Sequence, residues 1–536
     1  MLARGGELTA SIRTEPRNFT RLGPREPTTD LVALLLHGGL IRINRVTDDV
    51  EPWLAESWTV SADGRQYTLK LRPNVTFSDG HPLSADDVVF SFAASYDAGV
   101  PESLEVDGKR LVVSALDPLT VRVTFPSVFA PGLRILDNVV ILPRHKLEPA
   151  LEAGTLKSAW GVSTPPSDLV GLGPFVLSTY QSGQRLVFTR NARYWRRDSA
   201  ETTLPYLDRI TLDVVPDEST ELLRLESGQS DMTSSQLAAE AYAPLKRAAD
   251  GGRARLYDLG PALYPDCLWF NLRPGVFAGD PRAAWLQREE LRRAISLAVD
   301  RQVFADTVFL GAGVPVFGPV SPANKRWYWE GTPRIPHDPQ QAKMLLASIG
   351  LTDRQADGVL RDRDGVPVRF TILTQKGRPP FERGVAVIRD ELKKIGIAVD
   401  IGALEGNALI QQIYSGKYDA MYFNSFSSDN DPALTPDFWT SSGSAHFWNP
   451  EQKSPATEWE KQIDQLMHTL TESTDMANRK RAFDDVQRVF VEHQPAIYFV
   501  APRIFVGSST RVGNVTPALT RPQLLWSPDT LTVATP

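Results

Sequence analysis

The stretch from Pro52 to Phe92, PWLAESWTVSADGRQYTLKLRPNVTFSDGHPLSADDVVFSF, contains the patterns that decide the fold. Between Tyr67 and Leu71, apolar residues alternate with polar ones, and this period of two is typical of a strand with one buried face. The dipeptides Asp63-Gly64 and Asp79-Gly80 favour tight turns. The first part of the stretch therefore predicts a pair of strands bounded by turns.

A helix is expected to begin near the end of the same stretch. Ser84 is followed three residues later by Asp87, which is the spacing of an N-cap and its capping box. Val88, Val89 and Phe92 then begin an apolar helix face. These patterns predict structure and contain no catalytic motif, so evidence on function has to come from the rest of the chain.

Further short motifs follow in a fixed order over most of the remaining chain. They are GLGPF (171–175), NARYW (191–195), LDRI (207–210), VVPD (214–217), LESGQSD (225–231), LWFN (268–271), LRRAI (291–295) and DPQQAKMLL (338–346). Together with the opening stretch, this series resembles the signature of the family 5 extracellular solute-binding proteins. These are the dipeptide- and oligopeptide-binding components of bacterial ABC importers. The similarity covers nearly all of the 536 residues.

The resemblance implies an α/β fold of the periplasmic-binding-protein type II class, in its large peptide-binding cluster, with the ligand enclosed between two lobes. We expect a first lobe at residues 1–265 with an extra subdomain inserted at about 46–170, a second lobe at 266–500, and a return segment at 501–536 that packs on the first lobe. The sequence agrees with this division, because short strands and turns precede Asp266 whereas helices alternate with apolar strands after it.

Composition excludes several classes of protein. A net charge of −6, from 58 basic and 64 acidic residues, gives none of the basic excess of a nucleic-acid binder. No run of 18 apolar residues is present, so no membrane span is predicted. The first residues, MLARGGELTASIRTEP, lack the charged and apolar segments of a signal peptide, and we expect that a signal peptide has already been removed.

Catalytic and metal-binding patterns are absent from the sequence. The single cysteine, Cys267, lies in an apolar run and is expected to be a small buried residue. The seven histidines are scattered, and neither HExxH nor CxxC occurs. No GxSxG motif is present, and no pair of carboxylates is distinguished by its spacing. We therefore expect no enzyme activity, no cofactor and no protein-bound metal.

A polar turn after an expected strand at 418–423 is the predicted ligand site. In α/β sheets, ligands collect beyond the carboxyl ends of the strands. Peptide-binding relatives carry an aspartate in the corresponding stretch that pairs with the peptide ammonium, and the match is Asp429, with Asp431 as the second candidate. A role as an N-cap or in an Asx-turn is the alternative for both. The expected ligand-binding residues of this turn are Asn424, Phe426, Ser427, Asp429 and Asp431.

Arg378 is the expected partner of the ligand's carboxylate. It follows an apolar strand and precedes Pro379-Pro380, where a helix is expected to begin. Dipeptide-binding relatives have an Arg-Pro-Tyr run at this place, with the arginine on the carboxylate. A guanidinium can hold a carboxylate through two parallel hydrogen bonds, and the alternative is an exposed arginine before a helix.

Trp269, Phe270 and Asn271 are expected at a crossover between the lobes, where a tryptophan can line a cleft and an asparagine can bond a peptide backbone. Core packing is the alternative for Trp269. Trp439, downstream of the polar turn, could line a side-chain pocket or stack on a sugar ring.

These observations lead to one main hypothesis. The chain is expected to be a monomeric substrate-binding protein, periplasmic or extracellular and lipid-anchored, that captures a short peptide and delivers it to the transmembrane subunits of an ABC permease. An oligosaccharide, an opine or a nickel or other metal complex is the alternative ligand. A glycosidase or a peptidase is the alternative from a different class.

Overall fold

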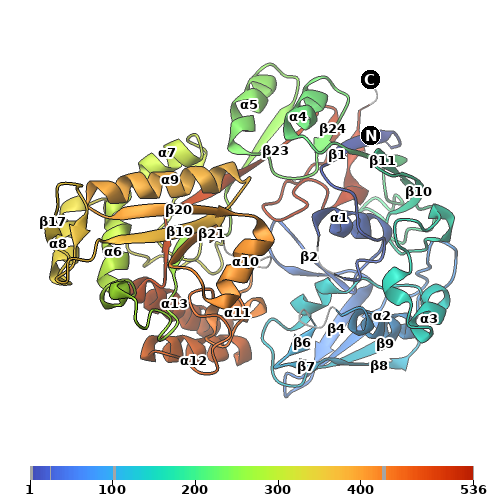
Figure 1. Ribbon diagram of the computed structural model, residues 1–536. Helices are drawn as coiled ribbons and strands as arrows, with labels where there is room; N and C mark the ends of the chain where they lie inside the picture. Colours follow the sequence, from blue (N-terminus) through green and yellow to red (C-terminus); the bar gives the residue numbers. More distant parts are fainter. Residues whose placement is uncertain (1–3, 24–25, 100–103, 425–429, 535–536) are drawn as a thin grey trace. The chain divides into compact units, whose positions relative to one another are not determined.

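The computed structural model describes residues 4–23, 26–99, 104–424 and 430–534, and the chain divides into two compact units (Figure 1). The first unit contains the chain up to Leu259 and again from Ile504, and the second contains Gly260–Arg503. The chain passes into the second unit within strand β14 (Arg255–Pro261) and returns within β23 (Val500–Ser508). The second unit is therefore an insertion in the sequence of the first.

The passage between units does not lie at residues 269–271, where the sequence analysis placed it. These residues belong to β15 (Asp266–Phe270) and the position after it. β15 pairs with β21 (Ala420–Asn424) on one side and with β22 (Ala496–Tyr498) on the other, so it is an interior strand of the second unit. At Asp266 the sequence changes from short strands and turns to helices that alternate with apolar strands. This change thus marks the first strand of the inserted unit.

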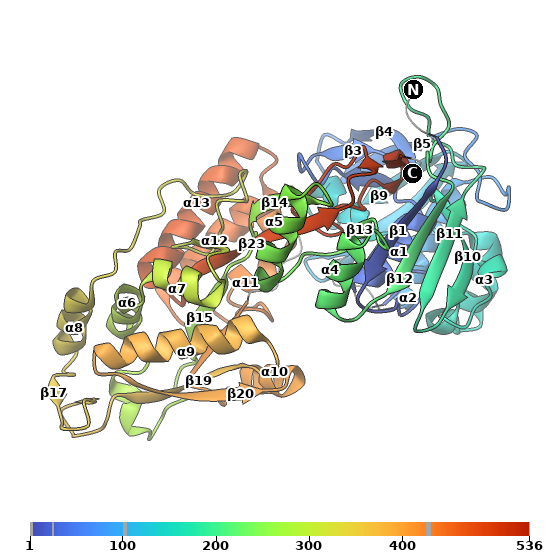
Figure 2. The same cartoon turned by 90° about the horizontal axis from the view of Figure 1, so that it is seen from above.

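A mixed sheet forms the first unit, with the strand order β10-β11-β12-β1-β13-β23-β14. β1 lies between two parallel neighbours, β12 and β13, and adjacent strands β1, β12, β11 and β10 can be followed in Figure 2. The strands not yet located are β10 (Phe175–Gln181), β11 (Arg185–Arg190), β12 (Arg209–Val214), β1 (Glu7–Ile12) and β13 (Met232–Thr233).

The opening sequence stretch supplies β4 (Ala55–Val60) and β5 to a second, antiparallel sheet of the first unit. Strands β8 (Val112–Asp117) and β9 (Thr120–Thr124) complete this sheet, in the order β4-β5-β9-β8. The predicted strand is β5 (Gln66–Leu71), and the predicted helix is α2 (Ala85–Asp97), which packs against β8. The Ser84 backbone N–H and hydroxyl both donate to the Asp87 carboxylate at 2.9 Å, so the capping box is confirmed. This sheet lies within the segment 46–170, whose status as a separate subdomain stays a prediction.

The first unit also contains shorter elements and further helices. They are α1 (Pro27–Leu36), β2 (Ile41–Ile43), β3 (Val50–Pro52), β4 (Ala55–Val60), β6 (Glu105–Val106), β7 (Lys109–Arg110), β8 (Val112–Asp117), β9 (Thr120–Thr124), α3 (Arg144–Glu152), α4 (Glu218–Glu226), α5 (Tyr242–Asp250), β24 (Val512–Gly513) and β25 (Thr532–Val533).

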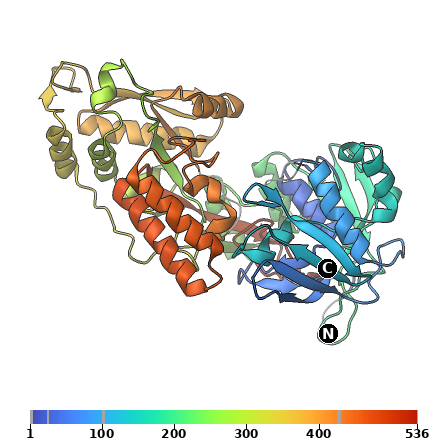
Figure 3. The ribbon, with the colours of Figure 1, turned by 90° about the horizontal axis from the view of Figure 1, so that it is seen from below.

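The second unit is built on a five-stranded sheet with the order β20-β19-β21-β15-β22. β19 (Arg369–Gln375) runs parallel to both β20 (Ala398–Leu404) and β21. Helix α9 (Pro379–Lys394) connects β19 to β20 and packs along the sheet (Figure 2). Helices α12 (Glu458–Glu472) and α13 (Met476–His493) lie side by side, as the orange-red helices in Figure 3 show.

The remaining elements of the second unit are shorter. They are α6 (Glu289–Ala298), α7 (Arg301–Val308), β16 (Gly313–Pro315), α8 (Pro339–Ser348), β17 (Asp353–Arg354), β18 (Leu360–Arg361), α10 (Gly406–Ser415) and α11 (Pro436–Trp439).

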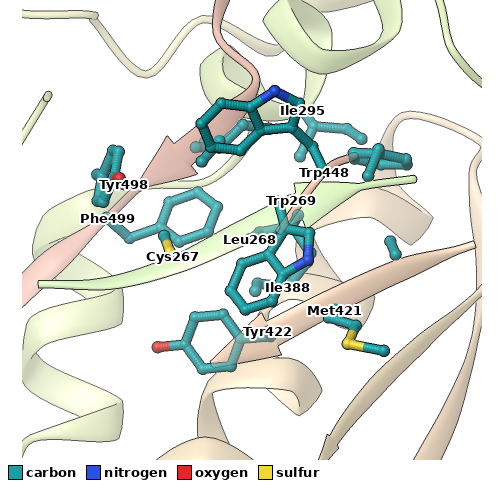
Figure 4. Close-up of a cluster of buried hydrophobic side chains, with 14 of the residues drawn as sticks. Cys267, Leu268, Trp269, Ile295, Ile388, Met421, Tyr422, Trp448, Tyr498 and Phe499 are labelled. Atoms are coloured by element: carbon teal, nitrogen blue, oxygen red, sulfur yellow. The ribbon is translucent and has the colours of Figure 1, made fainter. Parts of the chain in front are cut away.

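Aromatic and aliphatic side chains from all the central strands fill the core of the second unit (Figure 4). Cys267 is fully buried there, and burial raises the pKa of its thiol, so it has the inert character that the sequence predicted. Trp269 is 1% exposed and stacks on Phe447 with ring centroids 5.1 Å apart. The ring of Tyr422 packs against the ring of Phe381 in α9, with ring centroids 6.2 Å apart. This contact places α9 on the face of the sheet to which Tyr422 points.

Candidate functional site

One edge of the second unit's sheet collects the carboxyl ends of its parallel strands. β19 ends there at Gln375, β20 at Leu404 and β21 at Asn424. β15 runs in the opposite direction and begins at this edge, where Asp266 is paired with Asn424. We call this place the ligand edge, because ligands of α/β sheets bind beyond the carboxyl ends of the strands.

Arg378 lies at the ligand edge, as the N-cap residue of α9. The helix begins at Pro379, as the sequence predicted, since a proline is well accommodated in the first turn of a helix. The Arg378 side chain is exposed, and within the described ranges its guanidinium makes no hydrogen bond or ion pair. A free guanidinium beside the unpaired N–H groups of a helix start is suited to an anion.

A small apolar pocket with a cavity volume of about 30 Å³ lies in the same unit. Aromatic side chains from the C-terminal helices form much of its wall, namely Phe438, Trp439 and Phe483. Tyr264, Asn324 and Asn430 add polar groups to the lining. Among the described residues that line it, none carries a charge. This pocket is therefore an uncharged, apolar recess whose free volume is small.

Trp439 is the predicted site residue that the structure places in this pocket. It is 7% exposed and lies edge-on to Phe438 at 4.9 Å and to Phe483 at 5.1 Å. Asn424 is half-buried at the end of β21, so it lies at the ligand edge. Phe426, Ser427 and Asp429 are outside the described residues.

Asp431 is already paired within the protein. Its carboxylate accepts from Arg479 Nη2 at 2.7 Å and from the Ala433 backbone N–H at 3.1 Å, where it caps a short helical turn. The side chains of Asp431 and Arg479 are 6% and 5% exposed. Arg479 also donates to the Leu470 carbonyl and lies over the ring of Trp327. The N-cap alternative from the sequence analysis describes this aspartate, and the ammonium role does not fit it.

The strand residues Trp269, Phe270 and Asn271 are also internal. Phe270 is fully buried and packs on Phe370 with ring centroids 5.2 Å apart. Asn271 is 1% exposed, and its amide donates to the backbone carbonyls of Gly416 at 2.9 Å and Tyr418 at 3.2 Å. These side chains offer no surface to a ligand. Their expected role is corrected to core packing and loop attachment, because β15 is an interior strand.

The structure brings to the ligand edge one acidic residue that the sequence analysis missed. Asp266 is 6% exposed, and its Oδ2 accepts a long hydrogen bond of 3.4 Å from the Tyr422 hydroxyl. Burial raises the pKa of Asp266 to about 7. The available signal was an aspartate directly before an apolar strand, in YPDCLWFN.

Most of the chain matches a known protein family. Residues 49–447 match the model of the bacterial extracellular solute-binding proteins, family 5. The chain belongs to this family. The family and the fold class expected from the sequence motifs are thereby confirmed.

Known binding proteins resemble the chain over most of its length. A probable ABC transporter-binding protein of Deinococcus radiodurans is 27% identical over 92% of this chain and 87% of its own. The oligopeptide-binding protein AppA of Bacillus subtilis is 25% identical over 93% and 87%. The solved structure of that AppA, in complex with a nonapeptide, superposes with a TM-score of 0.74 at 23% identity, covering 100% of both chains.

No helix within the described ranges is both long and apolar enough to cross a bilayer. Over the same ranges, no group of three or more His, Cys, Asp or Glu side chains is placed to hold a metal ion.

Proposed function

We propose that this chain is the substrate-binding component of an ABC importer and that it captures a short peptide for delivery to the membrane permease. The observation that carries the proposal is the exposed guanidinium of Arg378, which has no partner among the described residues. It lies at the ligand edge of a unit that also contains an uncharged apolar pocket. A peptide offers matching groups, namely a terminal carboxylate and side chains of varied size. The similarity to peptide-binding AppA supports the same ligand class.

In this proposal, the residues of the second unit have separate roles. Arg378 and the first N–H groups of α9 hold the carboxylate, since a guanidinium bonds it at two oxygens and the helix end favours negative charge. The apolar pocket with Trp439 takes one side chain of the peptide. The protein acts outside the cytoplasm, in the periplasm or anchored to the outer face of the membrane, and it carries out no catalysis.

The test is calorimetric titration with a free-acid dipeptide that carries an apolar side chain, and with its C-terminal amide. Wild-type protein is expected to bind the acid at least tenfold more tightly, which corresponds to about 1.4 kcal/mol. Arg378→Ala is expected to lose this preference without a change in folding, because the side chain is exposed. Arg389→Ala is the matched control, since Arg389 lies on the same helix and pairs with its neighbour Asp390.

Equal affinity of wild type for acid and amide would remove Arg378 from the carboxylate role and would favour a longer peptide or a different ligand. A thermal-shift screen with peptides, oligosaccharides, opines and nickel complexes then identifies the ligand class. Reproducible hydrolysis of a peptide or glycoside by the pure protein would contradict the binding function itself.

A further inference from the structure

The methionines that the structure describes differ strongly in exposure. Met476 is 43% exposed and Met344 is 65% exposed. Met232, Met421 and Met467 are 0–1% exposed and lie among other buried side chains. Oxidation of a thioether requires that the oxidant reach its sulfur, so exposure decides which methionines react first. Oxidants in solution can therefore reach Met476 and Met344.

The sulfur of Met476 has a charged neighbour. Met476 is the first residue of α13, and Arg479 follows three positions later on the same face of the helix. The Arg479 guanidinium donates from Nη1 to the Met476 Sδ, and the two atoms are 3.8 Å apart. Met344 lies on α8, and within the described part of the chain no group donates to its sulfur. The two exposed methionines are thus a matched pair that differs in this contact.

Other contacts hold the guanidinium of Arg479 in place. The residue is 4% exposed, and its Nη2 donates to the Asp431 carboxylate at 2.7 Å. Its Nε donates to the Leu470 carbonyl at 2.9 Å, and the guanidinium lies over the ring of Trp327. The position of Nη1 is therefore set by the core. Because Asp431 uses Nη2, a stronger acceptor at the Met476 sulfur can bind Nη1 without displacing that carboxylate.

Oxidation would supply such an acceptor. The sulfur lone pair of a thioether attacks one oxygen of hydrogen peroxide, the O–O bond breaks, and the second oxygen leaves as water. The sulfur loses two electrons to the peroxide and becomes a sulfoxide, whose polar oxygen accepts hydrogen bonds far better than a thioether does. An S–O bond and a hydrogen bond of about 2.8 Å span the 3.8 Å between Sδ and Nη1 when they meet at roughly 120°.

We propose that Met476 is a modification site for oxidants of the peroxide class and that Arg479 binds the oxygen of the sulfoxide formed there. The side chain is already half-exposed, so the new polar oxygen loses little solvation. In return it gains a hydrogen bond from a charged donor that is already in position. Oxidation of Met476 therefore stabilises the fold, whereas oxidation of a buried methionine disrupts packing. This methionine can consume an oxidant while the protein stays folded.

The first test treats the folded protein with dilute hydrogen peroxide and follows each methionine by peptide mass spectrometry. Met476 and Met344 should gain one oxygen before the three buried methionines do. Thermal unfolding is then compared before and after oxidation in two variants, each of which keeps one of the exposed methionines. Met344→Leu, which keeps Met476, should melt about 2–4 °C higher once oxidised. Met476→Leu, which keeps Met344, should show no such rise.

The second test imitates the sulfoxide without an oxidant. Glutamine places an amide oxygen near the position of the sulfoxide oxygen, and glutamine, leucine and methionine have similar helix propensities. Met476→Gln should melt about 2–4 °C above Met476→Leu. Met344→Gln and Met344→Leu are the matched control and should melt together, because no donor faces that side chain.

Three results would overturn the proposal. One is oxidation of Met476 no faster than that of the buried methionines. Another is a melting temperature of the Met344→Leu protein that stays constant or falls on oxidation. The third is a Met476→Gln protein that is no more stable than Met476→Leu. All four variants change exposed side chains, and circular dichroism checks that each of them is folded.

Discussion

The buried carboxylate of Asp266 makes the stability of the second unit depend on pH in a direction opposite to that of a paired aspartate. Its pKa is raised from about 3.8 to about 7, because burial disfavours the ionised form. Between these values the unfolded chain has lost the proton and the folded chain keeps it. The folded state binds more protons, so the free energy of unfolding falls as the pH rises from about 4 to about 7.

The magnitude follows from the size of the shift. A difference of about three pKa units is worth roughly 4 kcal/mol at about 1.4 kcal/mol per unit. Asparagine has nearly the same shape and does not titrate. Asp266→Asn should therefore gain stability relative to wild type as the pH rises, by up to about 4 kcal/mol between pH 4 and pH 8. At roughly 2 °C per kcal/mol for a domain of this size, the melting temperatures should diverge by up to about 8 °C.

The assay is thermal unfolding of wild type and Asp266→Asn at pH 4.5, 6, 7 and 8, without ligand, with tryptophan fluorescence as the probe. Asp390→Asn serves as the control and should follow wild type, since its aspartate is exposed. If the melting temperatures of wild type and Asp266→Asn change in parallel over the whole pH range, the reasoning is refuted. Such a result would show that the carboxylate is solvated or compensated in the folded protein.

Three further substitutions test packing and pairing in the second unit. Asp431→Asn should lower the free energy of unfolding by about 3–5 kcal/mol in urea titration, because it leaves the Arg479 guanidinium buried without its partner carboxylate. Trp439→Ala should lower it by about 3–5 kcal/mol and should weaken binding of peptides with apolar side chains more than that of glycine peptides. Gly384→Ala should cost about 1–3 kcal/mol by thermal melting, because a Cβ there would lie 2.4 Å from the Tyr422 ring.

Local sequence patterns predicted the regular elements well. The alternation at 67–71 gave a strand that starts one residue earlier, at Gln66, and the proline pair after Arg378 correctly marked the start of α9. These predictions succeed because periodicity, caps and prolines act over a few residues, within reach of a sequence reading.

The site was harder to predict, because tertiary burial decides it. An aromatic residue has the same character in a cleft and in a core, so the sequence could not tell that Trp269 is internal and Trp439 lines a pocket. From the sequence alone, Asp431 is a candidate to bind a ligand ammonium. In the structure its carboxylate pairs with Arg479, which lies 48 residues away in the sequence. Asp266 was overlooked because nothing in its neighbours in sequence reveals that its charge is uncompensated.

The interior place of β23 in the first sheet has a consequence for the order of folding. β23 lies between β13 and β14, and the Gly507 backbone N–H donates to the Thr233 hydroxyl across a sequence separation of 274 residues. During synthesis, the second unit acquires all five strands of its sheet by Tyr498, whereas the first unit lacks a central strand until residues beyond Ile504 emerge. Contacts of such long range form slowly. The unit that begins at the N-terminus is therefore expected to complete its fold last, after the inserted unit has folded.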